Sequence, residues 1–74
     1  MKITVKLFAT FREGRDKIQI IEVNDKTTPQ NIIDMLGIDK AEVAILLING
    51  RDGEFDRVLS QDDVLSIFPP VGGG

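Results

Sequence analysis

The last seven residues, FPPVGGG (68–74), contain the one segment whose composition points directly to chemistry. Glycine loses more conformational entropy on ordering than any other residue, so Gly72, Gly73 and Gly74 are poorly suited to completing a packed fold. They offer instead the α-carboxylate of Gly74, which is ionised at neutral pH. A carboxylate can attack the α-phosphate of ATP, forming an acyl-adenylate and releasing pyrophosphate. Sulfur can then capture the acyl group as a thiocarboxylate, or an amine can capture it as an amide.

This chemistry requires the chain end to enter the active site of another protein. Glycines lack a Cβ and suit a narrow channel, while Pro69, Pro70 and Val71 begin the threading segment, with the prolines stiffening its exit from the fold. The five residues after Pro69 reach roughly 17 Å when fully extended. No glycine-rich phosphate loop precedes a helix, so a partner enzyme must hold the ATP. We therefore predict a carrier that binds no cofactor and is not an enzyme. The alternative interpretation is an inert, frayed terminus.

Composition excludes several other classes of function. A chain of 74 residues forms one domain, and 42% hydrophobic with 28% charged residues is ordinary for a globular protein. The absence of Cys and His removes disulfides, the usual zinc ligands and a Ser-His-Asp arrangement. The net charge of −3 argues against nucleic-acid binding. The longest apolar run, residues 43–48, is too short to span a bilayer, and no secretion signal precedes the fold. We expect a cytoplasmic protein without nucleic-acid or membrane partners.

The first half of the chain reads as a hairpin followed by a helix. Residues 1–9 alternate apolar and polar, which predicts a strand, and residues 17–23 predict its antiparallel partner, with a bulge where the alternation slips at Ile20–Ile21. Thr28 is a suitable N-cap and Pro29 a suitable first helical residue. Ile32, Ile33 and Leu36 share one helical face, and Gly37 predicts the end of a helix of two to three turns.

The second half predicts further strands. Residues 38–42 form a connector, with one helical turn capped by Asp39. Residues 43–48 are continuously apolar, which predicts a strand buried on both faces that ends at the Asn49–Gly50 turn. A short edge strand is expected at 57–59, and the last strand at 64–68.

The element order predicts the fold class. One main helix across a mixed sheet of four to five strands is an α+β, β-grasp (ubiquitin-like) roll, in which the first and last long strands run parallel side by side. We assign residues 1–69 to this domain and residues 70–74 to a flexible C-terminal tail.

Four segments, in this order, resemble the MoaD/ThiS group of ubiquitin-like sulfur carriers: KLFATFREG, TTPQNIIDMLG, ILLING and FPPVGGG. The resemblance covers essentially the whole chain, and FPPV before a terminal Gly-Gly is most similar to the small subunit of molybdopterin synthase. Two positions depart from the family pattern: Gln61-Asp62-Asp63 stands where Gly-Asp is frequent, and Gly72 where Ala or Ser is usual.

The resemblance implies the partners. A MoeB-like adenylating enzyme would activate Gly74 with ATP, a sulfur donor would supply the sulfur, and a MoaE-like large subunit would use it to build the dithiolene of molybdopterin for a molybdenum or tungsten cofactor. The alternatives are sulfur delivery to thiamin thiazole or tRNA, and a ubiquitin-like modifier joined to lysines. An inert β-grasp interaction module is a further alternative.

Several side chains remain open to two interpretations. Phe8 and Phe68 lie on the solvent side of their strands and are either partner contacts or covers for the edge of a small core. Four arginines are either steering charges for an acidic partner or solvated loop residues: Arg12, Arg15, Arg51 and Arg57. The acidic residues between 52 and 63 lack calcium-loop spacing, so we predict no metal site.

Overall fold

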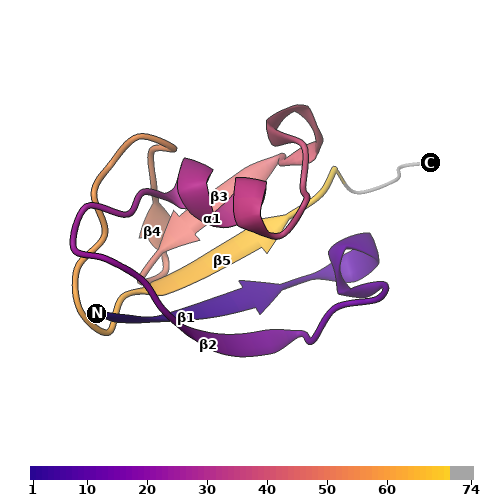
Figure 1. The fold of residues 1–74 in the computed structure, drawn as a ribbon. Helices are drawn as coiled ribbons and strands as arrows, with labels where there is room; N and C mark the ends of the chain where they lie inside the picture. Colours follow the sequence, from indigo (N-terminus) through magenta and orange to yellow (C-terminus); the bar gives the residue numbers. More distant parts are fainter. Residues whose placement is uncertain (71–74) are drawn as a thin grey trace.

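The computed structural model describes residues 1–70 and has the predicted β-grasp architecture, a mixed five-stranded sheet with one α-helix across one face (Figure 1). The strand order is β2-β1-β5-β3-β4. The strands are Lys2–Leu7 (β1), Ile18–Glu22 (β2), Ile45–Ile48 (β3), Arg51–Asp52 (β4) and Val64–Phe68 (β5), and the helices are the 3₁₀ turns Ala9–Arg12 (η1) and Lys40–Glu42 (η2) and the α-helix Pro29–Met35 (α1). The predicted element order is confirmed.

The N-terminal hairpin differs from the prediction at two points. β1 ends at Leu7 rather than at Ala9, because Ala9 has a φ of +52° and opens the η1 turn. The predicted bulge at Ile20–Ile21 is wrong, since the β1–β2 register is continuous from Lys2↔Glu22 to Lys6↔Ile18. The two isoleucines simply occupy opposite faces, with Ile21 packed against the core and Ile20 70% exposed.

Helix α1 begins and ends where the sequence predicts. The Thr28 hydroxyl accepts a hydrogen bond from the Asn31 backbone N–H, and the Asn31 side chain accepts one from the Thr28 N–H, so a reciprocal capping box satisfies two donors at the helix start. Gly37 follows the helix with a φ of +74°, a conformation that favours glycine. The buried face carries Ile32 and Ile33 against the sheet. The predicted turn capped by Asp39 is also confirmed, as its side chain accepts from the Ala41 N–H.

The C-terminal half corrects two expectations about strands. β3 is buried on one face only, because its residues alternate and Ile45 remains 47% exposed. The short edge strand lies at Arg51–Asp52, directly after the Asn49–Gly50 turn, and not at 57–59. Both turn residues have positive φ, 54° and 80°, so the two-residue turn returns the chain at once to pair with β3.

The core lies between α1 and the inner face of the sheet. β1 and β5 run parallel in the middle of the sheet, as predicted, and β5 also pairs antiparallel with β3. The core side chains shared by the three strands and α1 are fully or almost fully buried, and include Ile3, Val5, Leu7, Ile32, Ile33, Leu46, Ile48, Leu65 and Ile67. We call the opposite, helix-free side of the sheet the open face; it carries Phe8, Ile45, Leu47, Ser66 and Phe68.

Candidate functional site: the aromatic pair beside the C-terminal segment

The aromatic pair, Phe8 and Phe68, lies where the two central strands end. The parallel register pairs Leu7 with Ile67, so the next residue of each strand falls side by side on the open face. Their rings stack with centroids 4.1 Å apart and planes inclined by 11°. Both side chains are only half-buried, so one surface of the pair faces solvent. The rings cover each other and still present an exposed aromatic surface, and their role as partner contacts stays a prediction.

Arg12 extends this pair. Its guanidinium carbon lies 5.1 Å from the centroid of the Phe8 ring, within the range of a cation–π contact. The Arg12 Nε–H donates to the Leu7 carbonyl at 2.8 Å, which holds the side chain near the end of β1. The η1 turn creates this geometry because it folds residues 9–12 back beside Phe8. Sequence reasoning missed this contact because it extended the first strand to Ala9 and predicted no helical turn at residues 9–12, although the four-residue spacing between Phe8 and Arg12 was visible in FATFR.

The pair continues into an apolar strip on the open face. Ile45 lies opposite Phe68 in the β3–β5 ladder, and Leu47 lies opposite Ser66. Ile45 is 47% exposed, whereas Ser66 is buried in the centre of the sheet. A half-exposed cluster of two rings and an isoleucine, next to one cation, has the composition of a protein-binding surface and contains no pair of groups suited to acid–base catalysis.

The C-terminal segment leaves the fold beside this cluster. The Phe68 carbonyl accepts a hydrogen bond from the Ala44 N–H at 2.8 Å, which fixes the end of β5 to the start of β3. Pro69 is buried and Pro70 is exposed, so Pro69 belongs to the packed body and Pro70 is the first solvent-facing residue after the sheet. The structure does not describe the rest of the predicted tail. Outside the described residues lie the threading residues Val71, Gly72 and Gly73 and the predicted attachment site Gly74.

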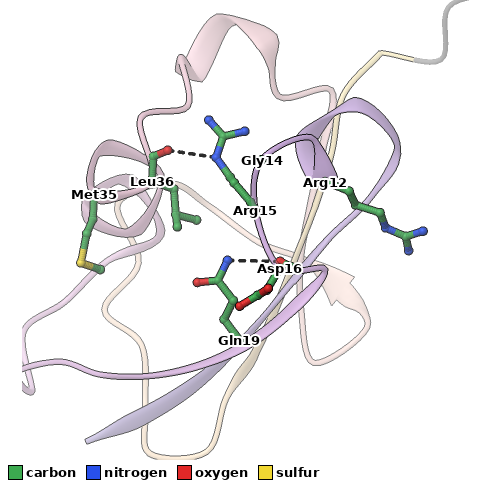
Figure 2. Close-up of a pocket in the computed structure, with 7 residues that line it drawn as sticks. All are labelled: Arg12, Gly14, Arg15, Asp16, Gln19, Met35 and Leu36. Atoms are coloured by element: carbon green, nitrogen blue, oxygen red, sulfur yellow. Dashed lines mark hydrogen bonds between the residues drawn. The ribbon is translucent and has the colours of Figure 1, made fainter.

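A separate hollow of about 580 Å³ lies between the hairpin turn and the C-terminal end of α1 (Figure 2). Arg15 points into it, donating from Nε to the Leu36 carbonyl at 3.1 Å and from a terminal nitrogen to the Phe11 carbonyl at 3.3 Å. Arg12 points away from it (Figure 2). Arg15 therefore joins the turn to the helix, whereas Arg51 and Arg57 are exposed.

The acidic region has a structural role at Asp63. This carboxylate is 7% exposed and accepts hydrogen bonds from the Asn49 side-chain amide and the Ser60 N–H, each at 2.8 Å. Asn49 in turn accepts from the Val64 N–H at 2.8 Å, so the network joins the β3–β4 turn to the start of β5. Within residues 1–70 no three acidic side chains converge as a metal site. No helix in the described part of the chain is long and apolar enough to cross a membrane.

Comparison with known proteins identifies the family of this chain. The model of the ThiS family matches residues 5–74. The chain belongs to the ThiS family. Its members are ubiquitin-like sulfur carriers of the ThiS/MoaD type, which agrees with the fold and with the recognition made from the four sequence segments. A comparison with curated proteins gives no significant match.

Solved structures of related folds cover nearly the whole chain. A putative molybdopterin converting factor subunit 1 from Pyrococcus furiosus is 27% identical, with a TM-score of 0.77 over 96% of this chain and 99% of that one. SAMP1, a small archaeal modifier protein of Haloferax volcanii, is 23% identical, with a TM-score of 0.80 over the full length of both chains. A complex of subunits 1 and 2 of the molybdopterin-converting factor from Helicobacter pylori 26695 contains a chain that is 20% identical, with a TM-score of 0.68 over the full length of both chains. The last two likenesses concern the fold alone.

Proposed function

We propose that this ThiS-family chain carries sulfur for molybdopterin synthesis as a thiocarboxylate on Gly74. The observation that carries the proposal is the position of the aromatic pair. A half-exposed pair of stacked rings lies where β5 ends, and Gly74 follows Phe68 by six residues. A partner that grips these rings would have the carboxylate at most roughly 20 Å away along the chain.

The proposed reaction takes place in the partner enzymes. The Gly74 carboxylate attacks the α-phosphate of ATP on a MoeB-like enzyme, and pyrophosphate leaves. Hydrosulfide then attacks the acyl carbon, AMP leaves with the C–O bond electrons, and the thiocarboxylate remains. A MoaE-like large subunit uses this sulfur for the dithiolene. This chain supplies only the docking surface and the reacting terminus, so we propose that it is not itself an enzyme and that it binds no ATP.

Two observations support the choice of pathway and partner. The FPPV segment precedes the terminal glycines, and the Pyrococcus furiosus structure, at 27% identity, is described as a converting factor subunit 1. The Helicobacter pylori subunit 1 is described in complex with subunit 2, and we propose an equivalent large-subunit partner here. Because activation consumes ATP, we place the reaction in the cytoplasm.

The test is intact mass spectrometry after incubation with a MoeB-like enzyme, Mg-ATP and inorganic sulfide. We expect a mass increase equal to the exchange of one oxygen for sulfur, located on Gly74 by fragmentation. A chain lacking Gly73 and Gly74 is the control and should remain unmodified. The charged protein should then convert a molybdopterin precursor when mixed with a MoaE-like subunit. Charging without any conversion would keep the sulfur-carrier function but exclude this pathway.

A modifier function uses the same activation and a lysine acceptor. The terminal diglycine and the fold likeness to SAMP1 favour it as the second candidate. It predicts higher-mass conjugates in cell extracts that disappear when Gly73 and Gly74 are deleted. Conjugates in the absence of precursor conversion would favour the modifier over the first proposal.

A further inference from the structure

The outer side of strand β2 has no partner within residues 1–70, because β2 is the edge of the sheet. On the inner side, Leu7 N–H donates to the Lys17 carbonyl and Val23 N–H donates to the Met1 carbonyl, each at 2.8 Å. In an antiparallel ladder these bonded pairs recur at every second residue, so Gln19 and Ile21 face β1. The intervening residues Ile18, Ile20 and Glu22 therefore direct their backbone N–H and C=O groups away from the sheet. β2 thus presents unpaired backbone groups along its whole length.

This edge has few of the features that protect edge strands, because Glu22 is the one charged residue of β2. Ile20, at its centre, is 70% exposed and Ile18 is 56% exposed, and the strand contains no proline and no bulge. The opposite edge, β4, is only two residues long and both are charged. Short and charged edges resist pairing with another chain, whereas a five-residue edge that exposes two isoleucines favours it. The two edges of the sheet therefore differ in length, in charge and in exposed apolar surface, and these features control whether an edge pairs with another chain.

We propose that β2 pairs antiparallel with β2 of a second copy of this chain, about a two-fold axis through Ile20. This register places Ile18 opposite Glu22 of the second copy, and Ile20 opposite its own counterpart. Every outward residue then meets an outward residue, and each facing pair exchanges two N–H···O bonds. The strand is therefore self-complementary, and the result is one continuous sheet across both copies.

The charge of Glu22 favours the same orientation. Antiparallel pairing places the two Glu22 carboxylates at opposite ends of the paired strands, whereas parallel in-register pairing would place them side by side on the open face. The hollow on the α1 side of β2, beside Gln19 and Met35, leaves room there for the side chains of the added strand (Figure 2).

The dimer is compatible with docking at the aromatic pair. β1 separates β2 from β5, so the edge used by the second copy is distinct from the end of β5 where Phe68 lies. The inference therefore does not depend on the sulfur-carrier proposal. Each copy keeps its own aromatic pair accessible, and the two-fold axis directs the two β5 ends to opposite sides.

The test is sedimentation equilibrium of the full chain from micromolar to millimolar concentration. We expect the weight-average mass to rise from monomer toward dimer. Replacement of Ile20 by Pro removes an outward N–H from each copy without removing a bond to β1, and should weaken dimerisation about tenfold or more. Far-UV circular dichroism checks that this variant folds. Ile45→Lys, a half-exposed isoleucine on β3, is the matched control and should leave dimerisation unchanged.

Amide hydrogen exchange supplies a second test that keeps the chain unaltered. Amide exchange at Ile18, Ile20 and Glu22 should slow as concentration rises. A protein that stays monomeric at millimolar concentration, or a dimer that is lost with Ile45→Lys and not with Ile20→Pro, would overturn the proposal.

Discussion

The stacked rings of Phe8 and Phe68 allow a double-mutant cycle that separates folding from docking. Replacing a fully buried Phe by Ala lowers the unfolding free energy by about 3–5 kcal/mol. Because each ring is only half-buried, its replacement by Ala should lower the unfolding free energy by about 2 kcal/mol. Rings 4.1 Å apart should be coupled by about 1 kcal/mol, so the double variant should lose less than the sum of the single losses. A domain of this size is stable by roughly 4–11 kcal/mol, so the single variants remain folded.

Urea unfolding of the wild type, both single variants and the double variant measures this coupling. The same proteins are then assayed for charging by a MoeB-like enzyme at saturating ATP, with the concentration of the carrier varied. If the aromatic pair anchors the partner, either replacement should raise the concentration needed for half-maximal charging about thirtyfold, because interface anchors contribute about 2 kcal/mol or more.

Ile20→Ala is the matched control for this experiment. Ile20 is a more exposed isoleucine on β2, on the same side of the sheet but away from β5, so its replacement should leave charging unchanged at low protein concentration. A coupling energy near zero would show that the rings do not stack in solution. Normal charging of the folded Phe8→Ala and Phe68→Ala variants would refute the docking role.

Three other substitutions test the structure directly. Thr28→Ala removes the hydroxyl of the capping box and should lower the unfolding free energy by about 1 kcal/mol in urea titrations, whereas Thr28→Ser should preserve it. Gly53→Ala should cost about 1–3 kcal/mol, because its Cβ would lie 2.6 Å from Cγ1 of the buried Ile48; an unchanged urea midpoint would show that the β3–β4 region repacks freely. Asn49→Ala leaves the buried Asp63 carboxylate short of a donor and puts Ala at a φ of 54°, so a loss of about 2–4 kcal/mol is expected, and Asn49→Gly should recover only the backbone part.

Local sequence determined the elements whose ends are set by neighbouring residues. The Thr28–Pro29 start of α1, its stop at Gly37 and the Asn49–Gly50 turn were all predicted, because capping hydrogen bonds and positive φ values are local requirements. The parallel pairing of the first and last long strands was also predicted, as part of the β-grasp fold. The chemistry of the Gly74 carboxylate stays a prediction from residue types alone.

Predictions failed where a residue's surroundings come from distant parts of the chain. Continuous apolarity suggested that β3 is covered on both faces, but α1 covers only one, and no second layer formed by residues 1–70 buries Ile45. The Ile20–Ile21 slip suggested a bulge, but pairing with β1 keeps the register and leaves Ile20 in solvent. In both cases the preference of isoleucine for a strand is local and is the same for a buried and an exposed side chain. The sequence pattern therefore could not tell which isoleucines are buried.

The sequence by itself determined the fold class and the helix boundaries, and it is the source of the proposal that the Gly74 carboxylate reacts. Only the tertiary structure decided that Phe8 and Phe68, sixty residues apart, stack beside the last strand, that Arg12 lies over one ring, and that β2 is an apolar edge while β4 is a short charged one. The physical reason is that hydrogen-bonding caps and turns act over a few residues. Stacking, strand neighbours and exposure depend instead on which distant segments the parallel β1–β5 pairing brings together.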